Sequence, residues 1–210
     1  MKILITGGNG DIAVAIKELL EEKGYTIYAP SKEEMDVTVP LQIERAMSAF
    51  QPDILINNAG YVVPQSIRNA DLNNTKRHIE INLLGVLYCS QIGMRYNPNL
   101  KIINVGSAAA VKVHPTWSEY CASKAGVAML NKCWAEDGVF SVCLSPGRTL
   151  TRMRKSLFED EDPNTLLDPN DFAKVVLMAV ENKFSSGTHL MVRRETVEEI
   201  LLGNLEGKEI

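Results

Sequence analysis

Short apolar runs alternate along the chain with longer segments in which apolar side chains recur every three or four positions. In the first longer segment, Ile12, Ile16 and Leu20 fall on one face of a helix. Gly24 follows at the point where that helix should end. The short runs predict strands at residues 2–6, 25–29, 53–57, 101–105, 139–144 and 189–192, and the periodic segments predict helices at 11–23, 40–50, 72–94, 117–135 and 168–181.

Strands separated by helices are typical of βαβ units, in which the strands run parallel and helices cover both faces of the sheet. We therefore predict an α/β fold with a doubly wound parallel sheet (a Rossmann fold) in three layers. The chain has no internal repeat and no linker-like segment. This favours a single domain over residues 1–210 that ends in a helical tail at 193–210.

Composition narrows the possible partners. The 210 residues are 45% hydrophobic and 23% charged, with a net charge of −4 and no basic stripe, so we expect no nucleic-acid partner. No apolar run reaches the roughly 20 residues that span a bilayer, and the N-terminus reads as a first strand rather than a signal peptide. We expect a cytoplasmic protein without a membrane partner. The four cysteines and three histidines follow no metal-ligating spacing, so no metal is expected.

A glycine-rich turn follows the first predicted strand, between Thr6 and Ala13. Gly7 permits a tight turn, and Gly10 lets the backbone approach a pyrophosphate at the positive end of the following helix. A glycine turn with a purely structural role is the alternative. Asp11 would repel a pyrophosphate unless its carboxylate points away. The candidate cofactor-binding residues in this loop are Gly7, Asn9, Gly10, Asp11 and Ile12.

The end of the second predicted strand bears on the choice of cofactor. NAD-dependent enzymes place an acid here to hold the ribose hydroxyls, but this chain has Ser31 and Lys32. Both side chains suit a 2′-phosphate, so we predict a small preference for NADP(H) over NAD(H). The alternative is that Lys32 is a solvated turn residue. Asp36, followed by Val37, is placed to contact the adenine edge.

Three residues suggest carbonyl chemistry. Ser107 follows the strand at 101–105, and Tyr120 and Lys124 lie one turn apart on the next predicted helix. The pKa of a free tyrosine is about 10, and a nearby ammonium together with a positive nicotinamide ring should lower it toward neutrality. Ser107 can hydrogen-bond the substrate oxygen. Alone, a Tyr-x-x-x-Lys pair is more often an exposed amphipathic pair, and the glycine loop and Ser107 reverse that interpretation.

Taken together, these motifs resemble the short-chain dehydrogenase/reductase family. The loop from Thr6 to Gly10 is similar to its cofactor loop, and Asn57-Asn58-Ala59-Gly60 to the motif that closes the fourth strand of the family. The resemblance implies a catalytic tetrad of Asn82, Ser107, Tyr120 and Lys124, in which the kinked helix around Asn82 holds a water that links the lysine to solvent. It further implies cofactor contacts from Asn58, Ala59, Gly60, Tyr120 and Lys124, and from Pro146, Gly147, Thr149 and Thr151 in the segment after Ser145.

The sequence also departs from that family. The spacing Gly-x-x-Gly-x-x-Ala and the short stretch 31–36 resemble nucleotide-sugar reductases instead. Residues 152–167, where the family often carries a substrate lid, are brief and acidic, and we expect either a short mobile lid or a plain surface loop. Near it, Arg148 is a candidate for binding a substrate phosphate or carboxylate, or the cofactor, with a surface salt bridge as the alternative. His114 is expected to face solvent, with a place in the pocket wall as the alternative.

Three functions follow from these patterns. The first is an NAD(P)-dependent oxidoreductase that moves hydride between nicotinamide and a small carbonyl or alcohol substrate, with Tyr120 as the general acid/base. The second is a nucleotide-sugar (deoxysugar) reductase or epimerase. The third is a dinucleotide-binding sensor without turnover, against which the set of Ser107, Tyr120 and Lys124 argues. The resemblance also suggests a homodimer or homotetramer built on the helices at 72–94 and 117–135.

Overall fold

The computed structural model describes residues 1–210 and contains one sheet of six parallel strands. Their spatial order is β2-β1-β3-β4-β5-β6, and every neighbouring pair is parallel. The strands are β1 (Lys2–Ile5), β2 (Thr26–Tyr28), β3 (Ile54–Asn57), β4 (Lys101–Val105), β5 (Ser141–Pro146) and β6 (His189–Val192).

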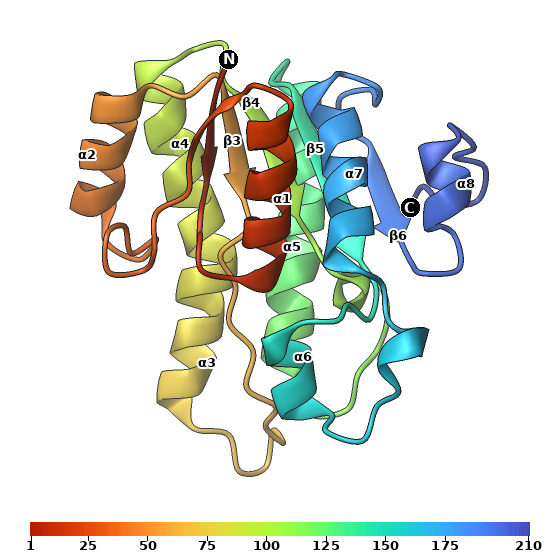
Figure 1. The fold of residues 1–210 in the computed structure, drawn as a ribbon. Helices are drawn as coiled ribbons and strands as arrows, with labels where there is room; N and C mark the ends of the chain where they lie inside the picture. Colours follow the sequence, from red (N-terminus) through yellow and green to blue (C-terminus); the bar gives the residue numbers. More distant parts are fainter.

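Helices cover both faces of this sheet (Figure 1). On one face α1 packs against α7, and on the other α2 packs against α4 while α5 lies over β5. The helices are α1 (Asp11–Glu22), α2 (Pro40–Phe50), α3 (Leu72–Ile79), α4 (Gly85–Tyr96), α5 (Ser118–Glu136), α6 (Arg152–Leu157), α7 (Pro169–Val180) and α8 (Val197–Leu201), with a π-helical turn η1 (Glu80–Leu84) and the 3-10 turns η2 (Ala108–Ala110) and η3 (Pro163–Thr165). This arrangement confirms the predicted three-layer, doubly wound α/β fold.

Alternation along the strands divides the core into two clusters. Ile3 and Ile5 of β1 belong to the cluster beneath α1 and α7, whereas Leu4 belongs to the cluster beneath α2 and α4. Both clusters are fully buried, as expected for a parallel sheet covered on both faces.

The predicted ranges agree with the structure except in two places. The single helix predicted over 72–94 is three pieces, because the π-helical turn η1 interrupts it between α3 and α4. The helical tail predicted over 193–210 is helical only in α8, and the chain then turns back so that Glu209 bridges antiparallel to Leu190. A hydrogen bond from the backbone of Met191 to the carbonyl of Lys208 holds this return at 2.9 Å.

The strand order determines where a ligand can bind. From β1 the chain passes first to β2 on one side and then to β3 on the other, so the loops after β1 and β3 diverge at their carboxyl ends. Such a switch point leaves a crevice between the loops. None of the helices combines the length and the apolar character that a membrane crossing requires.

Candidate functional site

A large cleft opens at the carboxyl ends of the strands. Its volume is about 1370 Å³, which exceeds the roughly 300–1,000 Å³ of ordinary ligand pockets. The glycine loop lines it on one side, and Ser107, Tyr120 and Lys124 line it on another. All candidate site residues named from the sequence line the cleft except Ser31 and Asn82.

The glycine loop leaves the start of α1 open to the cleft. Gly7 has a φ of +69°, which favours glycine. Gly8 packs so closely on the second strand's loop that a Cβ there would lie 2.0 Å from the carbonyl oxygen of Ala29. Gly10 is the N-cap of α1, and no side chain caps this helix. The first-turn amides of α1 are therefore available to an anion in the cleft.

Asp11 is held by Arg152, which begins α6 and lies 141 positions later in the chain. Its carboxylate accepts hydrogen bonds from the backbone N–H of Arg152 at 2.6 Å and from Arg152 Nε at 2.7 Å. Arg152 Nη2 also donates to the carbonyl oxygen of Asn9 at 2.6 Å. The guanidinium offsets the negative charge that Asp11 places beside the α1 amides, which removes the objection raised by the sequence.

Thr6 joins the glycine loop to the end of β3. Its hydroxyl oxygen accepts hydrogen bonds from the backbone N–H groups of Asn58 and Ala59, at 3.0 and 2.9 Å. In return, Asn58 Nδ2 donates to the carbonyl oxygen of Thr6 at 3.0 Å. Sequence reasoning used Thr6 only as part of a motif and missed this positioning role.

Ser107 is fixed by two residues that the sequence did not single out. Its N–H donates to Ser145 Oγ at 3.1 Å, and that oxygen lies 2.8 Å from Nε2 of the buried His189. Gly106 makes this approach possible, since a Cβ there would lie 2.3 Å from Ser145 Oγ. Ser107 Oγ accepts from the backbone N–H of Ala109 at 3.1 Å, so its hydroxyl faces η2 and Tyr120.

Tyr120 and Lys124 lie one turn apart on α5. Lys124 is only 4% exposed, and its Nζ lies 5.9 Å from the centre of the Tyr120 ring while donating to the carbonyl oxygen of Val105 at 2.9 Å. Burial lowers the pKa of Lys124 to about 8.

The surroundings of Tyr120 within the protein shift its pKa upward. Burial raises the pKa of Tyr120 above its ordinary value, and the hydrogen bond with Ser107 opposes this rise only in part. Lys124 Nζ donates to the carbonyl oxygen of Val105 in this arrangement. The lowering predicted from the sequence depends on a positive nicotinamide ring together with Lys124, so it stays a prediction.

Asn82 lies behind the cleft and is buried in the π-helical turn η1. Its Oδ1 accepts from the N–H of Tyr61 and its Nδ2 donates to the carbonyl of the same residue, both at 2.8 Å. A π-helical turn inside an α-helix is frequently associated with a functional site. Here it aligns an amide with the chain that leaves β3.

The loop after β2 carries charges of both signs. Lys32 Nζ lies 3.8 Å from Asp36 Oδ2, and both residues line the cleft together with Glu33. Backbone and Ser31 hydrogen bonds hold the pKa of Glu33 below its usual value. Ser31 does not line the cleft, and its N–H donates to the carboxylate of Glu34 at 2.7 Å.

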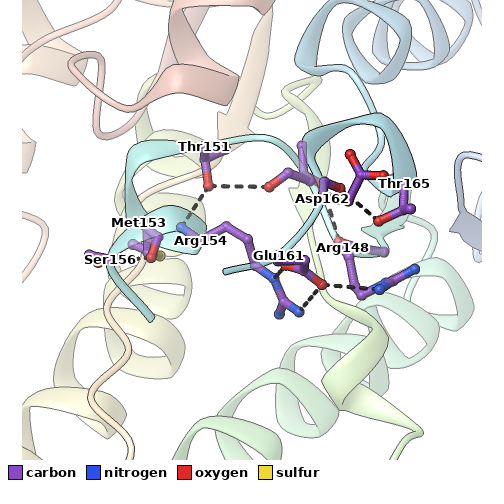
Figure 2. Close-up of polar contacts among 10 residues, drawn as sticks. Arg148, Thr151, Met153, Arg154, Ser156, Glu161, Asp162 and Thr165 are labelled. Carbon is purple, nitrogen blue, oxygen red and sulfur yellow. Dashed lines mark hydrogen bonds and ion pairs between the residues drawn. The ribbon is translucent and has the colours of Figure 1, made fainter. Parts of the chain in front are cut away.

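The segment 152–167, expected to be either a short lid or a surface loop, contains α6 and η3. Thr151 caps α6 by accepting a hydrogen bond from the N–H of Arg154 at 3.0 Å (Figure 2). Thr149 forms a parallel bridge with Leu167, which closes the segment at its base. His114, expected to face solvent, is half-buried and lines the cleft.

Comparison with known proteins identifies the family. The profile of the short chain dehydrogenase family matches residues 33–162. An uncharacterized oxidoreductase of Schizosaccharomyces pombe is 30% identical over 190 residues, covering 78% of this chain and 77% of that protein. The chain belongs to the short-chain dehydrogenase family of oxidoreductases.

Solved structures show the same fold. The ligand-free aldohexose dehydrogenase of Thermoplasma acidophilum has a TM-score of 0.81 at 24% identity, covering 91% of this chain and 92% of that one. ElxO with NADP bound has a TM-score of 0.80 at 21% identity, covering 91% of this chain and 96% of that one. In this dehydrogenase fold, the residues predicted from the sequence gather around one cleft.

Proposed function

We propose that this protein is an NAD(P)-dependent oxidoreductase that interconverts a small carbonyl compound and its alcohol, with Tyr120 as the general acid/base. The observation that carries the proposal is the meeting of Ser107, Tyr120 and Lys124 on one wall of a cleft whose other wall is the glycine loop. Membership of the short-chain dehydrogenase family supports it.

The cleft fits a dinucleotide. The uncapped first turn of α1 supplies amides for a pyrophosphate, and the approach of Gly7 to Ala59 leaves no room for a side chain, since a Cβ at Gly7 would lie 3.0 Å from Ala59 Cα. ElxO, which shares this fold, was solved with NADP bound. A bound reduced nicotinamide supplies a hydride to the carbonyl carbon and is itself oxidised. The residues proposed to hold the cofactor are Gly7, Asn9, Gly10, Asp11, Ile12, Lys32, Asp36, Val37, Asn58, Ala59, Gly60, Pro146, Gly147, Thr149 and Thr151.

The protein's own groups then handle the proton. The raised pKa keeps Tyr120 protonated at neutral pH, which suits an acid that donates its phenolic proton to the carbonyl oxygen during reduction. Ser107 donates a hydrogen bond to that oxygen and orients it. The ammonium of Lys124 stabilises the phenolate that remains, and Asn82 is proposed to hold the water through which the proton is replaced. Alcohol oxidation runs these steps in reverse.

The decisive experiment is Tyr120→Phe. Because the ring stays and only the proton donor is lost, turnover should fall by about 10²- to 10⁴-fold while cofactor affinity is unchanged. Tyr96→Phe is the matched control, since the Tyr96 hydroxyl lies 3.3 Å from Glu44 on the surface, away from the cleft. Turnover is followed by nicotinamide absorbance over a panel of aldehydes, ketones and alcohols. Undiminished turnover in Tyr120→Phe would show that the proposed mechanism is wrong.

We further propose that NADP(H) is preferred over NAD(H) by a small margin set by opposing charges. Lys32 attracts a 2′-phosphate, whereas ionised Glu33 repels it. Lys32→Ala should weaken NADPH binding by roughly threefold to tenfold with little effect on NADH, and Glu33→Gln should strengthen NADPH binding by a similar factor. Dissociation constants for both cofactors test this, and a wild type that prefers NADH and ignores both changes contradicts it.

A further inference from the structure

The cleft is basic although the chain is acidic. Nine of the chain's 22 lysines and arginines line it, but only four of its 26 aspartates and glutamates do. The segment 148–162 shows the separation most clearly. Arg148, Arg152 and Arg154 line the cleft, whereas none of the four acids at 159–162 does. The positive groups of this segment therefore face the place where a ligand binds.

Two of these arginines share a single carboxylate (Figure 2). Arg154 donates from Nε and Nη2 to the two oxygens of Glu161, at 2.6 and 2.9 Å, and Arg148 Nη1 donates to one of the same oxygens at 3.0 Å. These bonds, those of Arg154 first, hold the pKa of Glu161 below its usual value, so the carboxylate is ionised. Two guanidinium charges against one carboxylate leave one positive charge in this cluster. Arg154 is the less exposed arginine, with 17% of its side chain accessible.

A row of aromatic rings connects Arg154 with Tyr120. The Arg154 guanidinium lies 3.8 Å from the centre of the Phe158 ring, and Phe158 lies 6.1 Å from Trp117. Trp117 in turn stands edge-on to Tyr120 at 5.5 Å. All four residues line the cleft. A flat apolar group therefore has a surface to pack on between the proposed proton donor and the guanidinium.

The same region holds a second cation, Lys112, which lies near His114. Burial lowers the pKa of His114, and the charges of Lys112 and Arg154 lower it further. His114 stacks near Trp117 with a centroid distance of 5.2 Å. Two cations, Lys112 and Arg154, thus act on His114 beside this aromatic wall.

We propose that the substrate is an aromatic carbonyl compound or alcohol that carries a carboxylate, with its ring against Trp117 and Phe158 and its carboxylate on Arg154. This rests on the proposed carbonyl reduction. A guanidinium that is half-buried and already oriented by Glu161 and Phe158 loses little freedom when it binds an anion. With the carboxylate held there, the carbonyl or alcohol oxygen of the substrate points toward Tyr120.

The test compares two probes that differ only in charge, 4-formylbenzoate and 4-formylbenzamide. Dissociation constants are measured by calorimetry in the presence of NADP⁺, and kcat/KM is measured with NADPH. We expect the wild type to favour the acid by roughly 10- to 100-fold in both quantities. Arg154→Gln should abolish this preference, so that the variant binds and turns over the acid and the amide equally well. Lys155→Gln, a neighbour on α6 that does not line the cleft, should retain it.

A second variant guards against loss of structure in the segment 148–162. Glu161→Gln breaks the same ion pair but keeps Arg154, so it should increase the preference for the acid instead of abolishing it. Equal binding of the two probes to the wild type, or a preference that survives Arg154→Gln, overturns the inference. If both probes were turned over equally, the inference about the substrate would be overturned while the proposed function would still stand. Acid-selective binding that depends on Arg154 but occurs without turnover would support the anion site and count against the proposed reaction.

Discussion

The face of the sheet beneath α1 and α7 is built from aliphatic side chains, whereas the face beneath α4 and α5 buries a run of polar ones. In β5, Val142 and Leu144 point to the first face, and Ser141, Cys143 and Ser145 occupy the alternate positions. Side-chain hydrogen bonds connect Ser141 of this polar row to neighbouring strands on one side and to α5 on the other. They join Ser90, Asn57, Asn104, Ser141 and Asn131 in sequence across three strands and two helices.

The aliphatic face mainly stabilises the fold, whereas the polar face mainly positions side chains. Aliphatic contacts are non-directional and stabilise in proportion to the area buried. Buried hydrogen bonds add little net stability, but they are expensive to leave unmade and so fix the relative places of the groups they join. Farther along β5, Ser145 and His189 hold Ser107, and Cys143 lies near Lys124. We expect substitutions on one face to change folding and those on the other to change turnover.

The largest effect is expected from Phe172→Ala in α7, where the ring is fully buried in the aliphatic cluster. The cavity left behind should lower the free energy of unfolding by about 3–5 kcal/mol, measured by urea denaturation. Turnover per folded molecule should not change. Phe158→Ala is the matched control, because Phe158 is 40% exposed at the cleft. If both substitutions lowered the free energy of unfolding equally, the proposed separation between a stabilising face and a positioning face would be contradicted.

The polar face should make the protein sensitive to acid through His189. Burial, and secondarily the charge of Lys132, lowers its pKa to about 4, against about 6.5 in the unfolded chain. Above pH 6.5 the residue is neutral in both states. As the pH falls from 6.5 to 4, only the unfolded chain binds the proton, so stability falls by about 3 kcal/mol.

Unfolding curves across that pH range test this, with His189→Gln as the comparison. Glutamine keeps an acceptor for Ser145 but does not titrate there. The loss of stability between pH 6.5 and 4 should therefore be smaller in the variant. Identical pH profiles would show that His189 does not carry the acid sensitivity.

The smallest effects compare two neighbours in β5. Ser145→Ala removes the acceptor of the Ser107 N–H and should lower kcat by roughly tenfold with cofactor affinity unchanged. Leu144→Val, facing the aliphatic cluster, should lower stability by about 1 kcal/mol and leave kcat unchanged. Stopped-flow turnover and denaturation of both variants sharpen the comparison. If kcat fell in Leu144→Val but not in Ser145→Ala, the roles assigned to the two faces of the sheet would be reversed.

Parts of this division can be recognised in the sequence. The alternation of Ser141, Cys143 and Ser145 with Val142 and Leu144 is visible by eye, and it signals a polar face. The partners of that face are not visible. His189 lies on the adjacent strand but 44 positions away from Ser145, and no spacing rule connects them.

The sequence by itself determined the order of strands and helices, the parallel sheet and the residues around the cleft. Periodicity and glycine turns are local properties that predict the elements and the sheet, whereas most of the cleft residues followed from the resemblance to the short-chain dehydrogenase/reductase family. Only the tertiary structure decided which charges meet. It paired Asp11 with Arg152, placed two arginines on Glu161, and desolvated Tyr120 so that its pKa rises. Electrostatics and burial depend on distances between segments far apart in the chain, and folding alone sets those distances.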